Sequence, residues 1–344
     1  MKSVRWGMIG HGDVTEVKSG PGLYKADRSS LVSVAGRSLE KARDWAARHN
    51  GARVCDTPED LLADPEIDIV YIATPPSTHM AYTLMTARAG KHVCVEKPMA
   101  MDEAECREMI AACEAAGVRL YVAFYRRSMP RFVQVKQWID SGVIGEVRTV
   151  HAVQHQCAAQ SDTDSGNLPW RVRGEIAGGG KFVDMGVHEL DFFDFLFGPI
   201  EEAHGLAANL GGLYEVEDTV NAVWRHVNGV QGSGSWCYVC GRGEDRVEIT
   251  GSRGSIEFEF FNDTPLVLTD EHGTRQVSIP NPDHVHQPFF QSIVDELLGR
   301  GTCPGDADAA ARTSRVAGQL LSGYRTARSG VIGRSGQAAG PVRQ

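Results

Sequence analysis

The first third of the chain alternates short apolar runs with longer amphipathic segments. The apolar runs lie at 4–9, 31–36, 67–74, 92–98 and 118–124, and helical periodicity occurs between them at 38–50, 81–90 and 101–117. Strands that alternate with helices of ten or more residues are typical of a parallel sheet with crossover helices. Because the runs are apolar almost throughout, both faces of that sheet are expected to be covered.

The rest of the chain shows a different pattern. Strand-like runs divided by Gly, Asn and Asp turns lie at 147–157, 219–227, 229–240, 245–251, 254–260, 265–270 and 274–279. Amphipathic helices are expected at 286–301 and 307–327, and the residues after them are small and polar. We therefore predict two domains, 1–125 and 126–330, followed by a flexible tail at 331–344.

Composition narrows the classes of function. The chain has 344 residues, enough for two domains, with 42% hydrophobic and 23% charged residues, as in ordinary globular proteins. Its formal net charge of −9 argues against nucleic acid as the main partner, because phosphate binding needs a basic field. The sequence contains no run of about eighteen apolar residues, so no membrane span is expected.

The N-terminus and the cysteines indicate a cytoplasmic protein. The stretch MKSVRWGMIGHGD leads straight into a strand and a glycine turn, without the features of a signal peptide. The eight cysteines are scattered, and only Cys237 and Cys240 form a CxxC. That pair lies in an alternating strand, where residues three apart face opposite sides, so we expect reduced thiols and no metal site.

A glycine turn follows the first apolar run. Its residues are Gly10, His11, Gly12, Asp13 and Val14, followed by Thr15 where the dinucleotide fingerprint has Gly or Ala. Two glycines between a strand and a helix permit a tight turn and a close approach of a pyrophosphate to backbone amides. We predict a dinucleotide site here, with the helix packed slightly further from the strand at Thr15.

The end of the second apolar run bears on the choice of cofactor. NAD-selective sites carry an acidic residue there that binds the ribose hydroxyls, whereas this chain has Arg37 and Ser38. These residues could bind a 2′-phosphate through a charge-assisted hydrogen bond and a hydroxyl. Alternatively, Ser38 caps the next helix and Arg37 is solvated, and both interpretations can hold together. We favour NADP(H), with NAD(H) as the alternative.

The stretch GGGKFVDMGVHELD, at 178–191, places polar groups among apolar ones. Read as a helix after a glycine turn, it puts Asp184 and His188 on one face, with Asp191 near the same stripe. A histidine and carboxylates against apolar packing are suited to proton transfer. A buried histidine satisfied by a neighbouring Asp is the alternative, which this segment alone leaves open.

Several motifs occur together in one order. After the glycine turn come ATPPSTH at 73–79, AGKHV followed by Glu96-Lys97-Pro98, YRR at 125–127, Trp170-Arg171 and the GGG…DxGxH…D stretch. In this combination the chain resembles the Gfo/Idh/MocA family of pyridine-nucleotide oxidoreductases, which includes glucose–fructose oxidoreductase and inositol dehydrogenase. The resemblance covers nearly all of residues 1–325.

The resemblance implies a fold and an assembly. It implies an N-terminal Rossmann dinucleotide-binding domain and a larger C-terminal α/β domain with a large open, mostly antiparallel sheet. The strand-like runs of the second part agree with this α/β architecture. An open sheet of that size needs a covered face, and in the family that face forms a homodimer or a homotetramer.

The resemblance also implies catalytic residues. Lys97 corresponds to the catalytic lysine, and Asp184 and His188 to the acid–base pair. An ammonium close to the substrate oxygen stabilises developing alkoxide charge. His188 has the intrinsic pKa for proton transfer near neutrality, and Asp184 would orient it or hold the substrate hydroxyl. Whether Lys97 or His188 takes the proton directly stays open, and Asp191 is either substrate-binding or structural.

Further site residues come from the other motifs. The remaining cofactor residues implied by the family are Thr74, Pro75, His79, Glu96, Trp170 and Arg171. Tyr125 stands where many relatives have Asn, so a substrate contact at this position departs from the family pattern. His151 and His155 share one face of an expected strand, and they either approach the substrate or are structural.

The resulting hypothesis is an NAD(P)-dependent dehydrogenase or reductase. It transfers a hydride between nicotinamide C4 and a secondary hydroxyl, or the matching carbonyl, of a sugar, inositol or related polyol. No metal is required, because Lys97 and His188 supply the electrophilic and proton-transfer roles. The alternatives are an NADP-dependent dihydrodiol dehydrogenase or carbonyl reductase of the same family and, in a second class, a catalytically inactive NADP(H)-binding regulatory protein.

Overall fold

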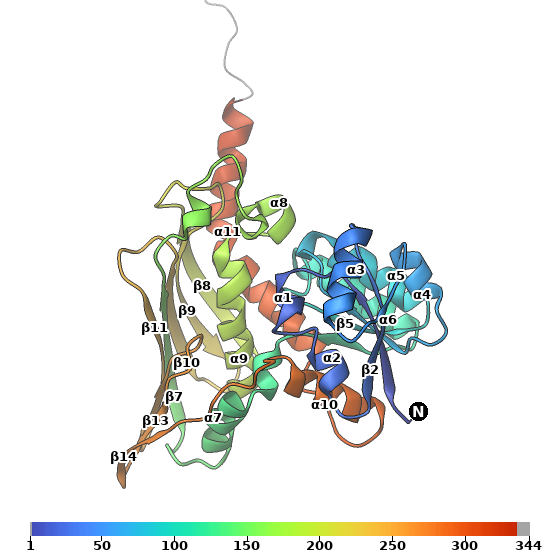
Figure 1. The fold of residues 1–344 in the computed structure, drawn as a ribbon. Helices are drawn as coiled ribbons and strands as arrows, with labels where there is room; N and C mark the ends of the chain where they lie inside the picture. The colour runs from blue at the N-terminus through green and yellow to red at the C-terminus, as the bar shows by residue number, and fades with distance from the viewer. Residues whose placement is uncertain (1, 336–344) are drawn as a thin grey trace, which may run out of the picture.

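The protein, seen here in a computed structural model, consists of two packed units (Figure 1). The structure describes residues 2–335, with side chains up to residue 327. The N-terminal unit is an α/β domain, and the second unit is a large sheet with helices on one face. This is the fold class that the sequence predicts. No helix within the described residues is long and apolar enough to cross a membrane.

The N-terminal unit is built on a six-stranded sheet in the order β3-β2-β1-β4-β5-β6, with every neighbouring pair parallel. Its strands are β1 (Val4–Ile9), β2 (Ser29–Ala35), β3 (Arg53–Val54), β4 (Ile69–Ile72), β5 (His92–Val95) and β6 (Leu120–Val122). The strand order is that of a dinucleotide-binding sheet, in which the two halves diverge between β1 and β4. The carboxyl ends of these two strands therefore flank a crevice.

Helices cover both faces of this sheet. They are α1 (Asp13–Glu16), α2 (Gly22–Lys25), α3 (Leu39–Arg48), α4 (Pro58–Ala63), α5 (His79–Arg88) and α6 (Glu103–Ala115). The side chains of Ser38, Thr57 and Asp102 each accept a hydrogen bond from a backbone N–H in the first turn of α3, α4 and α6. These caps satisfy amides that a helix start would otherwise leave unpaired, so they fix where the three helices begin.

The helix after the glycine turn is short. α1 has four residues, and the Gly and Pro residues at 20–22 separate it from α2. Thr15 is fully buried, and its hydroxyl donates to the backbone oxygen of Gly12 at 2.7 Å. Thr15, which replaces the Gly or Ala of the fingerprint, therefore fits by donating a hydrogen bond that closes the turn.

The second unit contains an eight-stranded sheet in the order β14-β13-β12-β11-β7-β10-β9-β8. Its strands are β7 (Val147–His155), β8 (Ile200–Ala208), β9 (Thr219–His226), β10 (Gln231–Cys237), β11 (Glu244–Gly251), β12 (Ser255–Phe258), β13 (Leu266–Asp270) and β14 (Gly273–Val277). Neighbouring strands are antiparallel except for β7 and β10, which run parallel. β8 at the sheet edge was not expected from the sequence.

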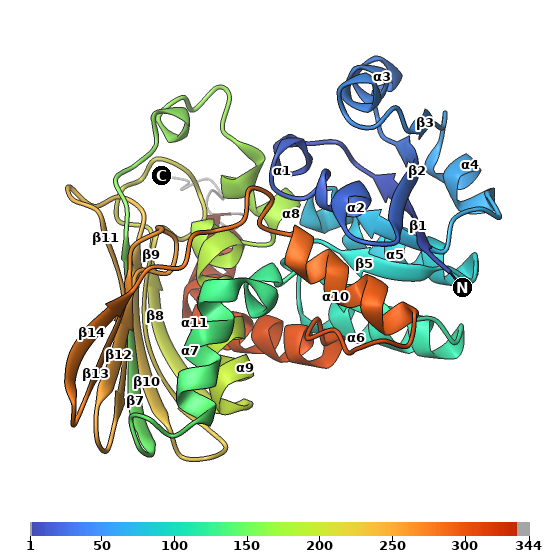
Figure 2. The ribbon, with the colours of Figure 1, turned by 60° about the horizontal axis from the view of Figure 1, so that its bottom comes forward.

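Helices lie on one face of this sheet and leave the other face bare (Figure 2). The second unit contains α7 (Pro130–Asp140), α8 (Gly174–Ala177), α9 (Val187–Phe197), α10 (Gln287–Leu297) and α11 (Ala307–Ser335). β9 has the alternation of a one-sided sheet, with Val220, Ala222 and Trp224 buried. Leu206 and Val223 on the bare face are 81% and 55% exposed.

The last two helices tie the units together. α10 packs against α2, and α11 packs against both α6 and α9. The chain end thus stabilises the N-terminal unit, although the sequence division at residue 125 assigns it to the second. α11 continues to Ser335, so the first residues of the predicted tail are helical, and its remainder, 336–344, lies outside the described residues.

Candidate functional site

The glycine turn lies where β1 ends. Gly10 has a φ of +97°, and a Cβ at this residue would come within 2.6 Å of the backbone oxygen of Ala73. Only glycine fits such a conformation and such a close approach. A Cβ at Gly12 would meet nothing within 4 Å, so the turn is open on that side. A phosphate group could approach the backbone there.

A cleft of about 1110 Å³ runs from this turn to the interface between the two units. Among the predicted cofactor residues, it is lined by Gly10, His11, Gly12, Asp13, Val14, Arg37, Ser38, Thr74, Pro75, Glu96, Lys97, Trp170 and Arg171. The last two come from a 3₁₀ turn of the second unit, Trp170–Val172, so both units form the walls. The Nε2 of His11 is buried against Gly36 and has no hydrogen-bond partner in the described structure. The residues present fit a dinucleotide.

His79 is the predicted cofactor residue that lies behind the wall of the cleft. It is fully buried, and its Nδ1 and Nε2 lie 3.0 and 2.7 Å from the backbone oxygens of Pro98 and Thr74. Burial is the main cause that lowers its pKa. These contacts join the loop after β4 to the loop after β5, so they support a positioning role.

Glu96 is held by a buried polar network. Its carboxylate accepts from the Tyr71 hydroxyl at 2.5 Å and lies 2.9 Å from Nε2 of His286. Burial raises the pKa of Glu96, but the charges of His286 and Lys97 and the bond from Tyr71 outweigh it and lower the pKa to about 2. The network fixes the end of β5, and thereby the backbone that carries Lys97.

Lys97 points across the cleft to the second unit. Its Nζ lies 2.6 Å from Oδ1 and 2.8 Å from the backbone oxygen of Asp184. The other carboxylate oxygen of Asp184 lies 3.2 Å from Nε of Arg171. Burial raises the pKa of Asp184, but Lys97 and Arg171 lower it below its usual value, so the carboxylate is ionised. The pair places an ammonium inside the cleft with a fixed direction.

The segment that carries Asp184 is a helix with one wide turn. Phe182–Gly186 is a π-helical turn, and α9 continues from Val187. Such turns often occur at functional sites. The expected helix is present, but the carboxylate of Asp184 bonds Lys97 and Arg171 rather than His188. The prediction that Asp184 orients His188 therefore finds no support in the contacts.

His188 lies in an aromatic environment. Its ring makes edge contacts with Phe124, Tyr125 and Phe261, with centroids 5.8, 5.6 and 6.4 Å away. Burial, followed by the charges of Arg126 and Lys97, holds the pKa of His188 well below its usual value, so the imidazole is neutral at pH 7. Its buried Nδ1 has no hydrogen-bond partner in the described structure. A neutral ring can accept a proton, as a general base must.

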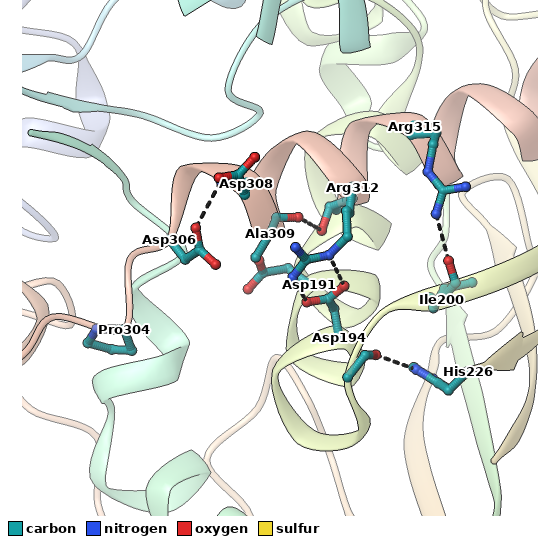
Figure 3. Close-up of polar contacts among 12 residues, drawn as sticks. Asp191, Asp194, Ile200, His226, Pro304, Asp306, Asp308, Ala309, Arg312 and Arg315 are labelled. Atoms are coloured by element: carbon teal, nitrogen blue, oxygen red, sulfur yellow. Dashed lines mark hydrogen bonds and ion pairs between the residues drawn. The ribbon is translucent and has the colours of Figure 1, made fainter. Parts of the chain in front are cut away.

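Asp191 lies in the interior instead of the cleft. Arg127 donates from Nε and Nη2 to its two carboxylate oxygens at 2.8 and 2.6 Å. Burial raises the pKa of Asp191 to about 6 against the opposing effect of Arg127. Figure 3 shows a second pair nearby, in which Arg312 of α11 holds Asp194 of α9 at 2.7 Å. Of the two roles left open from the sequence, these contacts support the structural one.

The strand histidines face away from the helices. His151 and His155 on β7 lie 2.7 and 2.9 Å from the hydroxyls of Ser233 and Ser235 on the neighbouring strand. The alternating residue Trp236 packs on the opposite face, against Phe182. These contacts support the structural alternative for both histidines.

Two further residues near the site were not assigned a role from the sequence. His286 lies 190 positions from Glu96, at the start of α10, and it also stacks on Tyr125 at 4.0 Å. Arg126 donates to the Tyr125 hydroxyl at 2.8 Å, which occupies the group expected to contact substrate. The contact of His286 is not detectable from spacing, because it depends on how the second unit folds back onto the first.

Family models match both units. The model described as "Oxidoreductase family, NAD-binding Rossmann fold" matches residues 4–124, and the "GFO/IDH/MocA C-terminal domain" matches residues 132–257. Among solved structures, the aldose-aldose oxidoreductase from Caulobacter crescentus complexed with glycerol superposes with a TM-score of 0.83. It is 24% identical and the match covers 95% of this chain and 98% of that one, so the likeness shows the fold.

Two related proteins support the family assignment. The chain is 34% identical over 313 residues to "Oxidoreductase P35" of Formosa agariphila, covering 91% of this chain and 97% of the relative. It is 30% identical over 278 residues to the trans-1,2-dihydrobenzene-1,2-diol dehydrogenase of Sus scrofa, covering 78% and 79%. The chain therefore belongs to the Gfo/Idh/MocA family of oxidoreductases and is an NAD(P)-dependent dehydrogenase or reductase acting on CH–OH groups.

Proposed function

We propose that this chain transfers a hydride reversibly between nicotinamide C4 of NADP(H) and a secondary hydroxyl, or the matching carbonyl, of a sugar, inositol or related polyol. The observation that carries the proposal is the ammonium of Lys97, held by Asp184 at 2.6 Å inside the cleft. When bound, the nicotinamide supplies the hydride chemistry. The protein supplies orientation, charge stabilisation and proton transfer.

Three side chains divide this work. Lys97 donates a charge-assisted hydrogen bond to the reacting oxygen and stabilises negative charge that develops there. Asp184 fixes the direction of the Lys97 ammonium, as their contact at 2.6 Å supports. His188 is neutral, and its Nδ1 is sealed from solvent. Its Nε2 is not sealed and makes no hydrogen bond within the described residues, so Nε2 can take the hydroxyl proton during oxidation and return it during reduction. Lys97 and His188 together handle the proton.

The cofactor preference is proposed from the end of β2. Arg37 and Ser38 line the cleft there, and no carboxylate occupies the position that binds ribose hydroxyls in NAD-selective sites. Ser38 also accepts from the backbone N–H of Lys41 as the cap of α3, so both roles foreseen for it are compatible. A cationic side chain beside a hydroxyl favours a 2′-phosphate, and hence NADP(H).

Absorbance at 340 nm tests this proposal. Purified protein is assayed with NADP or NAD and a panel of sugars, inositols and polyols, next to Lys97→Ala. Lys136→Ala is the matched control, because that lysine pairs with Asp140 on the surface of α7. We expect turnover that Lys97→Ala abolishes and Lys136→Ala retains. Turnover that survives Lys97→Ala would contradict the mechanism, and failure of NADPH to bind, followed by its fluorescence, would contradict the cofactor assignment.

A second candidate is a dihydrodiol dehydrogenase or carbonyl reductase. The aromatic rings of Phe124, Tyr125 and Phe261 around His188 favour an apolar substrate ring, and one relative is named for a dihydrobenzenediol. The same assay with a trans-dihydrodiol separates the two. A higher kcat/KM for the dihydrodiol than for every sugar would support this candidate.

The bare face of the sheet supports a homo-oligomer. Leu206 and Val223 lie on adjacent strands, β8 and β9, and both are largely exposed. Exposed apolar side chains on a bare sheet mark interaction sites. We propose that two or four chains pair through this face. Light scattering of the wild type and of Leu206→Asp tests the proposal, which predicts a smaller assembly for the variant.

A further inference from the structure

Three arginines lie close together in sequence near the site, and two of them are held by oxygen atoms of the protein. Arg127 forms the two-bond pair with Asp191. Arg131 donates to three backbone carbonyls of the segment 259–264. Arg127 is thus neutralised by a carboxylate, and both terminal nitrogens of Arg131 donate to carbonyl oxygens, although the buried Nε of Arg131 has no partner within the described residues.

The third, Arg126, is only 9% exposed and has no such partner. Its Cζ lies 5.1, 5.7, 5.0 and 4.7 Å from the ring centroids of Tyr125, Phe132, Phe260 and Phe261. Its Nη1 donates to the Tyr125 hydroxyl, whereas Nε and Nη2 make no hydrogen bond within the described residues. Neither atom is among the polar atoms sealed from solvent, so both donors reach accessible space.

No carboxyl group forms an ion pair with Arg126 within the described residues. Asp245 accepts from the backbone N–H groups of Phe260 and Phe261 at 2.8 and 2.7 Å. Glu189 accepts from Nε1 of Trp236 at 2.5 Å, and burial raises its pKa to about 8, so it is protonated at pH 7. A buried charge without a counter-charge destabilises the folded protein, so Arg126 is not placed there for stability. Such a charge with free donors is a candidate for ligand binding.

Arg126 lies close to the residue proposed to move the proton. The rings of Tyr125 and Phe261 contact both its guanidinium and the imidazole of His188. The charge of Arg126 is, after burial, the largest cause of the low pKa of His188. Arg126 and His188 therefore share two neighbouring rings, which places the free donors of Arg126 near the proposed base.

We propose that the substrate carries a carboxylate and that Arg126 binds it, while Lys97 and His188 act on a hydroxyl of the same molecule. The inference rests on the proposed function, because it names the substrate class of that site as a sugar acid. Nε and Nη2 lie on the same edge of a guanidinium, and this edge binds a carboxylate through two parallel hydrogen bonds. Arg127 already binds Asp191 in this way.

A carboxylate matches the free charge better than a phosphate does. A phosphate group carries about two negative charges near pH 7, whereas Arg126 offers a single positive charge. The second charge would be left against the aromatic rings, where an unpaired charge is costly. A carboxylate leaves no net charge.

The test compares matched acidic and neutral sugars. The pairs are D-glucuronate with D-glucose and D-galacturonate with D-galactose, with D-glucose 6-phosphate as the dianion. We expect the wild type to favour an acidic member about tenfold or more in kcat/KM, since charge-assisted hydrogen bonds have this strength. In Arg126→Gln that preference should fall to near unity, mainly through KM. Arg148→Gln, at an exposed arginine of β7 paired with Glu146, should keep it.

Arg126→Lys distinguishes loss of carboxylate binding from a structural effect of the substitution. Arg126→Lys keeps the charge and loses the two-bond geometry, so we expect a preference between those of the wild type and Arg126→Gln. If the Gln variant does not fold, as judged by its thermal unfolding, the Lys variant carries the comparison. A preference unchanged in the folded variants, or one for the 6-phosphate, overturns the inference.

A binding measurement separates this inference from the proposed function. Calorimetric titration of the sugar acid into the wild-type protein should show binding that is about tenfold weaker in Arg126→Gln. Turnover of neutral sugars with no preference for acids overturns the inference and leaves the proposed function standing. NADPH binding with neither turnover nor binding of any sugar contradicts both.

Discussion

Two ion pairs in this structure have the same length and different surroundings. Nζ of Lys97 lies 2.6 Å from Asp184, and Nη2 of Arg127 lies 2.6 Å from Asp191. The side chains of the first pair are 14% and 16% exposed at the cleft, and those of the second are 5% and 3% exposed. Both carboxylates come from the same helical segment, seven positions apart. Ion pairs of equal length therefore occur both in the cleft and in the core.

The pKa values of the two carboxyls separate the pairs further. Burial raises both pKa values, but Asp184 has two cations beside it, Lys97 and Arg171, and its pKa ends below the usual value. Asp191 has one cation, Arg127, and the negative charge of Asp194 opposes its ionisation, so its pKa is about 6. An excess of cations leaves a positive group available to a substrate oxygen. The sealed pair offers none.

Breaking the cleft pair should have the largest effect. Asp184→Asn keeps the shape and removes the charge that directs Lys97, so we expect kcat/KM to fall by about 10²–10³. The free energy of unfolding should change by less than about 1 kcal/mol, since the pair is partly solvated. Steady-state kinetics and urea unfolding of one preparation measure both. A large loss of stability with retained activity would show that the pair is structural.

Breaking the sealed pair should reverse this result. Asp191→Asn leaves the guanidinium of Arg127 buried without a counter-charge, and we expect about 3 kcal/mol less unfolding free energy. The folded fraction should keep its KM for the substrate, because the pair does not line the cleft. Urea unfolding monitored by tryptophan fluorescence gives the first quantity. A selective rise in KM with unchanged stability would instead support a substrate contact at Asp191.

Glu189 is a buried carboxyl group that has no ion pair within the described residues, so it extends the comparison of the two pairs. Burial raises the pKa of Glu189 to about 8, so the native state retains a proton that the unfolded chain loses above pH 4.5. Stability from this group is complete below pH 4.5 and is lost as the pH rises through 8. Relative to Glu189→Gln, which does not titrate, the wild type should lose about 2 kcal/mol between pH 6 and 8.

Denaturant unfolding of both proteins at each pH checks the Glu189 prediction. Glu217→Gln is an informative companion, because burial also raises the pKa of that carboxyl, to about 7, while it accepts from the backbone N–H of Gly180 at 2.7 Å. A difference between wild type and Glu189→Gln that stays constant from pH 6 to 8 would show that Glu189 is ionised in the native state.

The cleft pair was foreseeable in part, and the sealed pair was not. Apolar runs followed by turns mark strand ends, so the sequence correctly indicated a lysine at the end of β5 and a glycine turn after β1. The contact between Arg127 and Asp191 joins positions 64 apart, through a turn and a helix whose packing no local pattern specifies. The prediction for Asp184 failed to identify Lys97 as its partner for the same reason.

Element boundaries show where local rules give way to packing. The π-helical turn at Phe182–Gly186 has no signature of its own, because a wide turn is selected by the contacts that it permits. β8 was missed because it is an edge strand with alternate residues in solvent, and its sequence, IEEAHGLAA, lacks β-branched residues after Ile200. Both elements depend on neighbours distant in sequence.

A cleft cation without a carboxylate completes the comparison, with the smallest expected effect. Arg37 lines the far end of the cleft, and no ion pair of its side chain occurs in the described part of the chain. Arg37→Ala should raise the KM for NADP about tenfold, because one charge-assisted contact at a solvated site is lost. The KM for NAD should stay within about twofold.

Ser38→Ala is the neighbouring control, in which loss of the α3 cap should cost about 1 kcal/mol of stability. Since Ser38 and Arg37 are adjacent, equal changes for both cofactors in both variants would mean that the turn only shapes the cleft. A selective change for NADP in Arg37→Ala alone would mean that the unpaired charge of Arg37 binds the 2′-phosphate of the cofactor.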